Sequence, residues 1–172
     1  KDKGIPVIYV VSPQIWGWHY SRIERIRRDV SLMLPLFAFE KEIYEKEGVS
    51  AQVIGHPLVS RIKRRLREEP AIPVEKKKMT IGLLPGSRGS EVMRLLPAML
   101  DAAVLIREMK PRVRFLIPVV NPDVESFVRE ECAKRPRLQV EVLPNRSLRV
   151  MEASDILILA SGTATLEAAW FE

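Results

Sequence analysis

Short runs of apolar, often β-branched residues alternate with longer amphipathic segments along almost the whole chain. Short runs that are mainly apolar predict buried strands, and they occupy residues 5–11, 31–37, 51–55, 79–85, 113–120, 138–144 and 155–160. Segments with helical periodicity occupy residues 19–28, 39–48, 90–110, 122–136, 147–154 and the stretch that begins at 161. Strands that alternate with helices through short connections predict an α/β fold, with parallel sheets and helices on both faces.

A charged segment with two prolines interrupts this alternation at residues 58–78, LVSRIKRRLREEPAIPVEKKK. Its first part is compatible with a helix, and its second part is typical of a linker. We therefore expect two α/β halves, residues 1–69 with the start of the linker and residues 79–172, joined through 70–78. A ligand cleft is expected between the halves.

Composition indicates the general kind of protein and of ligand, but it does not identify a function. The net charge of +6 favours anionic ligands, which include nucleotides, phosphosugars, nucleic acid and acidic membranes. The single cysteine, Cys132, has no partner for an internal disulfide, which suits a reducing compartment. No apolar run approaches the ~20 residues that span a bilayer, and we see no signal peptide. Because the chain starts without methionine and ends inside a helical pattern, we interpret it as an internal piece of a longer protein.

The first stretch that indicates chemistry is LLPGSRGSEV, where a predicted strand turns into a predicted helix. Ligands of open α/β sheets bind at this edge, and the free N–H groups of a helix start favour phosphate. Gly86 allows close backbone approach, Ser87 offers a hydroxyl, and Arg88 offers a planar pair of donors. Glu91 lies in the first helical turn, where the helix dipole favours a carboxylate. An ordinary helix start with a solvated arginine explains the turn equally well, and neither the P-loop nor the dinucleotide spacing is present.

A second turn, LASGTATLEAA, follows another predicted strand. Ser161 and Thr163 could cap the helix or bind phosphate, and Gly162 permits close approach. Glu167 lies four residues after Thr163 on the same helix face, where it could accept hydrogen bonds from ribose hydroxyls. Helix capping without a ligand remains an alternative. Two such turns at the ends of different strands favour a ligand that carries phosphate.

Five stretches in this order, YVVSPQIWGW, FAFEKEIYEKEGV, VIGHPL, LLPGSRGSEV and ASGTATLEAA, resemble the lipid-A-disaccharide synthase family of bacteria. The resemblance covers essentially the whole chain apart from the linker. It implies the GT-B glycosyltransferase fold, with two Rossmann-like halves of which this chain holds only a part each. It also implies a cytoplasmic protein that associates peripherally with the inner membrane.

The family transfers 2,3-diacylglucosamine from its UDP donor to 2,3-diacylglucosamine 1-phosphate, which gives lipid A disaccharide 1-phosphate and UDP. The resemblance implies that Arg88 stabilises charge on the leaving UDP, and that no metal or organic cofactor takes part. The predicted substrate site comprises Gly86, Ser87, Arg88, Glu91, Ser161, Gly162, Thr163 and Glu167, with Trp18 and His19 as further candidates.

The chain departs from the family pattern at two places. Trp16-Gly17-Trp18-His19 stands where members commonly have Trp-Ala-Trp-Arg, so a phosphate-binding arginine is absent and the role of His19 is open. Phe37-Ala38-Phe39-Glu40 stands where they commonly have Leu-Pro-Phe-Glu. The aspartate proposed as general base in the family lies upstream of Gly4, so this chain alone is not expected to catalyse.

Other residues leave alternatives open. Trp16, Trp18 and Tyr20, beside the basic helix 19–28, could contact lipid or could pack the cleft wall with solvated arginines outside. We interpret His56 as structural and Asn121 as a helix cap, and we give Cys132 no role.

Two other functions compete with the glycosyltransferase. An isomerase like UDP-N-acetylglucosamine 2-epimerase would share the fold, and nucleic-acid binding is suggested only by the charge. We expect no nucleic-acid partner.

Overall fold

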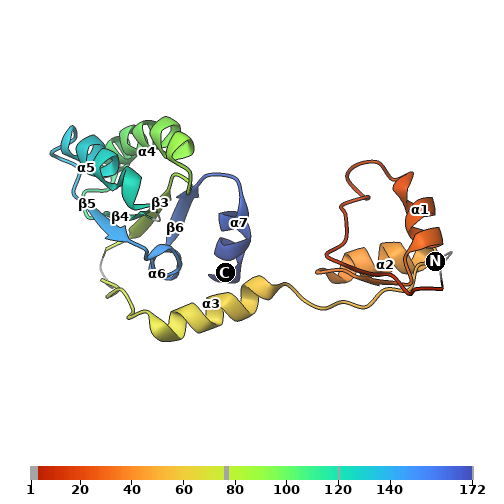
Figure 1. The fold of residues 1–172 in the computed structure, drawn as a ribbon. Coiled ribbons are helices and arrows are strands. Elements are labelled where there is room, and N and C mark those ends of the chain that lie inside the picture. The colour runs from red at the N-terminus through yellow and green to blue at the C-terminus, as the bar shows by residue number, and fades with distance from the viewer. Residues whose placement is uncertain (1–3, 76–77, 120, 172) are drawn as a thin grey trace. The chain divides into compact units, whose positions relative to one another are not determined.

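The computed structural model describes residues 4–75, 78–119 and 121–171. The chain forms two compact units, which divide between Pro57 and Leu58 (Figure 1).

The first unit contains a two-stranded parallel sheet and two helices. Its elements are β1 (Ile8–Val10), α1 (Arg22–Asp29), β2 (Leu32–Leu34) and α2 (Ala38–Lys46). The segment 51–55, predicted as a strand, forms a single isolated bridge between Ala51 and Met33. The amides of Gln52 and Ile54 donate to the carbonyl oxygens of Met33 and Pro35, but Pro35 has no N–H with which to form a second bridge.

Tyr44 organises the small core of the first unit. Its side chain is 1% exposed, and its hydroxyl donates a hydrogen bond of 2.9 Å to the carbonyl oxygen of Pro13. Burial, and after it the nearby Glu40 carboxylate, raises the pKa of Tyr44 to about 12. The phenol therefore stays protonated and fastens the loop after β1 to α2.

The second unit has the alternating order that the sequence predicts. Its elements are α3 (Pro57–Glu68), β3 (Thr80–Leu84), α4 (Gly89–Met109), β4 (Arg114–Val119), a 3₁₀ turn (Pro122–Val124), α5 (Glu125–Ala133), β5 (Val140–Pro144), α6 (Ser147–Glu152), β6 (Ile156–Leu159), α7 (Thr163–Ala168) and a closing 3₁₀ turn (Ala169–Phe171). The four strands form a parallel sheet in the order β5-β4-β3-β6.

Helices cover both faces of this sheet, because successive strand side chains point to opposite sides. Phe115 and Ile117 of β4 pack into a core formed with α4 and α5. Leu116, between them, packs into a second core with residues of α3 and α6. Figure 1 shows α4 and α5 on one side of the sheet and α6 and α3 on the other. The predicted α/β class with parallel sheets is confirmed.

Helix α3 packs with the second unit. Leu58 and Ile62 are buried in the core that contains α6. Arg149 of α6, itself 8% exposed, donates hydrogen bonds to the carbonyl oxygens of Leu66 and Glu69 at the end of α3. The sequence assigned this helix to the first half, whereas its contacts are with the second unit. The domain limits at 69 and 79 stay a prediction for the longer protein.

Gly82, in the middle of β3, allows the layer behind the sheet to come close. A Cβ atom at this position would lie 2.7 Å from Leu157 Cδ2 and 2.7 Å from Ser154 Oγ, and 3.2 Å from Val150 Cγ1 of α6. Real Cβ atoms essentially never come within 3.0 Å of another atom, so a side chain at position 82 would require Leu157 and Ser154 to shift and would crowd Val150 of α6.

We expect Gly82→Ala to lower the free energy of unfolding of the full-length protein by about 1–3 kcal/mol, because overpacking displaces neighbouring atoms. Urea denaturation followed by circular dichroism measures the change. Gly17→Ala is the control, since a Cβ there would meet nothing closer than Gln14 O at 3.8 Å. Equal stability of the two variants would contradict the close approach at Gly82.

Candidate functional site

The two turns singled out in the sequence lie side by side at one edge of the sheet. Strands β3 and β6 pair in parallel from Ile81 and Ile156 to Leu84 and Leu159, so both end at the same edge. The amide of Ala160 donates a 2.9 Å hydrogen bond to the Leu84 carbonyl oxygen, which holds the two strand ends together.

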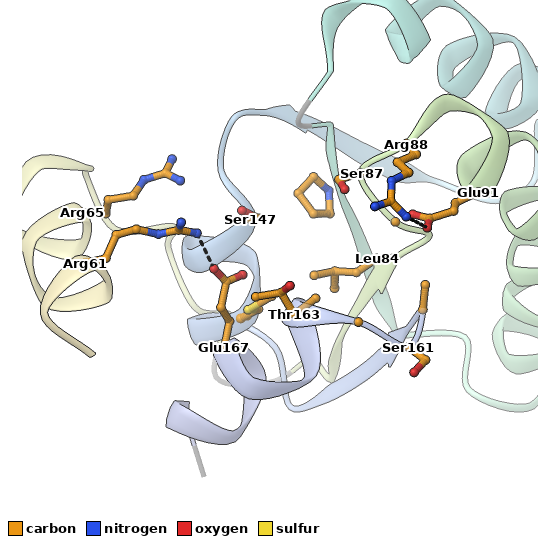
Figure 2. Close-up of a pocket in the computed structure, with 16 residues that line it drawn as sticks. Arg61, Arg65, Leu84, Ser87, Arg88, Glu91, Ser147, Ser161, Thr163 and Glu167 are labelled. Atoms are coloured by element: carbon orange, nitrogen blue, oxygen red, sulfur yellow. Dashed lines mark hydrogen bonds and ion pairs between the residues drawn. The ribbon is translucent and has the colours of Figure 1, made fainter. Parts of the chain in front are cut away.

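Both turns border a single pocket of about 430 Å³ (Figure 2). All eight residues predicted from the turns line it: Gly86, Ser87, Arg88, Glu91, Ser161, Gly162, Thr163 and Glu167. The volume falls in the range of roughly 300–1,000 Å³ that is usual for small-molecule sites.

The first turn is shaped by a close contact between Gly86 and Glu91. Gly86 has a φ of +118°, and a Cβ there would lie 2.7 Å from Glu91 Oε2. Glu91 Oε1 in turn holds Arg88 Nη1 at 3.2 Å. The Arg88 side chain is 81% exposed, so its guanidinium is oriented by a carboxylate while it remains open to a ligand.

The second turn begins α7 without a side-chain cap. Gly162 is the N-cap residue, and no side chain caps the helix start. The hydroxyl of Thr165 donates a 2.6 Å hydrogen bond to the Gly162 carbonyl oxygen. Capping by Ser161 or Thr163, the alternative left open by the sequence, is therefore not adopted, and the Thr163 hydroxyl lies at the pocket (Figure 2).

Glu167 is buried and forms an ion pair that the sequence did not indicate. Its side chain is 12% exposed, and its Oε1 lies 2.8 Å from Arg61 Nη2 of α3. Arg65, one turn further along α3, also lines the pocket. It is held by Glu69 Oε1 at 2.7 Å and donates to the Asn145 carbonyl oxygen at 3.3 Å.

Both arginines were missed because their segment was interpreted as a charged helix leading into a linker. A signal was present in the spacing. Arg61 and Arg65 are four residues apart, and with the buried Leu58 and Ile62 they occupy positions i, i+3, i+4 and i+7 of one helix face, so both arginines border the apolar stripe that packs on the second unit.

The pocket has cationic groups on opposite sides. Figure 2 shows Arg61 and Arg65 on one side, Arg88 with Glu91 on the other, and Ser87 and Thr163 between them. Hydroxyls between guanidinium groups suit a ligand with several anionic oxygens, since arginine binds such oxygens through charge-assisted hydrogen bonds.

The comparison with known families agrees with the resemblance. The model of the lipid-A-disaccharide synthetase family matches residues 1–172. The chain belongs to this family. The resemblance predicted from the five sequence stretches is thereby confirmed.

Similar proteins of this family are much longer than the 172-residue chain. Lipid-A-disaccharide synthase of Alcanivorax borkumensis is 36% identical over 169 residues, which are 96% of this chain and 44% of the relative. The enzymes so named from Nitrosococcus oceani and Anaeromyxobacter dehalogenans are 39% and 40% identical over 98% of this chain and 44% of each relative. The chain thus spans less than half the length of these lipid-A-disaccharide synthases.

The remaining candidates, Trp18 and His19, lie in the first unit, and a role in the site of this synthetase family stays a prediction for both. Trp18 is 75% exposed, and His19 has a φ of +54°. Trp16 packs edge-on against Phe39, with ring centroids 5.4 Å apart. The hydroxyl of Tyr20 donates to Glu47 Oε1 at 2.7 Å.

Three residues outside the predicted site also have defined surroundings. Asn121 Oδ1 accepts a 2.9 Å hydrogen bond from the Asp123 amide, so its predicted capping role is confirmed. His56 lies against Phe37, with ring centroids 5.6 Å apart. Burial raises the pKa of the half-buried Cys132 thiol, which keeps it protonated.

Two other features are absent from residues 4–75, 78–119 and 121–171. Within these ranges, no group of three or more His, Cys, Asp and Glu side chains is arranged to hold a metal ion. No helix in the same part of the chain is both long and apolar enough to cross a membrane.

We expect Gly86→Ala to lower the free energy of unfolding by about 1–3 kcal/mol, because the positive φ disfavours a side chain and the new Cβ overlaps Glu91. Gly55→Ala is the matched control, since Gly55 has a φ of +75° but a Cβ there would meet no atom within 4 Å. Thermal unfolding of the full-length variants compares the two. A loss at Gly86 no larger than that at Gly55 would show that the Glu91 contact is unimportant.

Proposed function

We propose that this chain is part of a hexosyltransferase that moves 2,3-diacylglucosamine from its UDP donor to 2,3-diacylglucosamine 1-phosphate. In this proposal the pocket of the second unit holds the UDP part of the donor. The observation that carries the proposal is the meeting of two turns, with Arg88 and Thr163, at one pocket in a member of the lipid-A-disaccharide synthetase family.

The diphosphate is the part of the donor that fits the first turn best. Helix α4 has 21 residues and begins at Gly89, and no side chain caps its first amides, so they can donate to a ligand while the helix dipole favours negative charge. Ser87 and Arg88 add donors in front of this helix. Such an arrangement binds phosphate oxygens in many α/β proteins.

Transfer requires the bond between the anomeric carbon and the diphosphate oxygen to break as the acceptor hydroxyl attacks the anomeric carbon. Negative charge then grows on the leaving diphosphate, where Arg88 and the α4 amides can stabilise it. The acceptor hydroxyl must lose its proton to a base, which we propose is an aspartate upstream of Gly4 in the longer protein. Glu91 keeps the guanidinium of Arg88 in place before the donor binds.

We expect Arg88→Ala in the full-length protein to lower kcat by ~100-fold or more, because a fixed donor to developing charge is lost. Release of UDP in the presence of donor and acceptor measures turnover. Arg94→Ala is the control, since Arg94 is exposed on the same helix and does not line the pocket.

Two outcomes would contradict the proposal. Unchanged turnover of Arg88→Ala would remove the role of this arginine. Formation of an epimerised sugar nucleotide by the wild-type protein, with no disaccharide, would show that the reaction is of another kind.

The acylated substrates imply that the full-length protein works at the cytoplasmic face of the inner membrane. In the first unit, Trp16, Trp18 and Tyr20 are exposed beside the basic helix α1, which suits a surface of anionic lipid.

We expect the full-length protein to co-sediment with vesicles that contain anionic phospholipid, and Trp18→Ser to reduce the bound fraction. Leu105→Ser, which replaces another exposed apolar residue on α4, is the control. Equal binding of the two variants would remove Trp18 from the membrane contact.

A further inference from the structure

We propose that Arg61 is a positioning residue, which holds the Glu167 carboxylate in the orientation that receives the ribose hydroxyls of the nucleotide. Arg61 would thereby set the preference of the site for ribonucleotides over 2′-deoxyribonucleotides. The inference rests on the proposed function, because it assumes that the pocket binds a uridine nucleotide.

The ion pair places one oxygen of Glu167 and leaves the other for a ligand. Arg61 Nη2 lies 2.8 Å from Oε1 of a carboxylate that is 12% exposed. Among the described residues, no second group binds this carboxylate, so Oε2 keeps its capacity to accept hydrogen bonds. A buried carboxylate is stable only with a partner, and without Arg61 it would turn towards water.

Arg61 is a suitable anchor because its helix is fixed to the same unit as the pocket. Leu58 and Ile62, on either side of it in sequence, are buried in the core behind the sheet. The carbonyl oxygens at the end of α3 are bound by Arg149. The backbone that carries Arg61 therefore cannot drift relative to α7, which carries Glu167.

The Arg61 side chain is 55% exposed, so its ion pair is expected to contribute little to folding stability. We expect the ion pair to fix the orientation of the Glu167 carboxylate instead. A carboxylate that accepts from a ribose hydroxyl distinguishes UDP from 2′-deoxy-UDP by about 10-fold or more, the ratio that corresponds to one hydrogen bond to a charged group.

The experiment measures the Kd of UDP and of 2′-deoxy-UDP for the full-length protein by isothermal titration calorimetry. We expect the wild-type protein to prefer UDP by about 10-fold or more. Arg61→Ala should lose most of this preference through weaker binding of UDP, while the Kd of 2′-deoxy-UDP changes little. Arg61→Lys should restore part of it, since the ammonium can still meet the carboxylate.

Two further variants make the result specific. Glu167→Gln should lose the preference as Arg61→Ala does. Arg64→Ala, which removes an exposed arginine from the same helix outside the pocket, should keep it. The melting temperature of each variant shows whether the fold is retained, and Arg61→Lys provides the comparison if Arg61→Ala is unstable.

Each contrary outcome has a separate meaning. If Glu167→Gln loses the preference and Arg61→Ala keeps it, the inference is overturned while the proposed function stands. If Arg61→Ala weakens both nucleotides equally, Arg61 acts on the phosphates and is not a positioning residue. If the wild-type protein binds neither nucleotide, the proposed function itself fails.

Discussion

The parallel pairing of β3 with β6 is the interaction on which the site depends. Two parallel neighbours end at the same edge, so residues that are distant in sequence reach the same pocket. The hydrogen bond from Ala160 to Leu84 continues the pairing beyond the strands and joins the two turns at their bases. A change of register between β3 and β6 would therefore separate Arg88 from Thr163 even if each turn kept its own conformation.

Carboxylates hold each arginine of the pocket in place before a ligand arrives. The pairs are Arg61 with Glu167, Arg65 with Glu69 and Arg88 with Glu91. Such pairing lowers the loss of side-chain entropy when an anion binds, because the guanidinium groups already have defined orientations. It also partly neutralises them, so an incoming phosphate must compete with the carboxylates. The site is therefore suited to a ligand with more than one negative charge.

Local patterns were sufficient to predict the order of strands and helices from residue 79 onwards and the two turns, because buried strands and phosphate-type turns have short sequence signatures. The contribution of α3 was not predictable in the same way, since Arg61 meets Glu167 across 106 positions of the sequence. The strand expected at 51–55 shows another limit. Its residues are mostly apolar and bond to the strand Leu32–Leu34 and to Pro35, but Pro35 has no N–H to extend the pairing beyond the single bridge at Ala51. The start of α7 was also not predictable, because Ser161 and Thr163 both have hydroxyls suited to capping, whereas the residue at the cap position is Gly162.

The missing side chain at Gly82 has a consequence for how this region can evolve. Met151 and Ser147 of α6 form part of the pocket wall, and Val150 of the same helix lies close to β3 at the position that has no side chain, Gly82. A methyl group there could be tolerated if Leu157 and Ser154 became smaller at the same time. Positions 82, 154 and 157 should therefore change together or not at all, which couples the thickness of the layer behind β3 to the depth of the pocket.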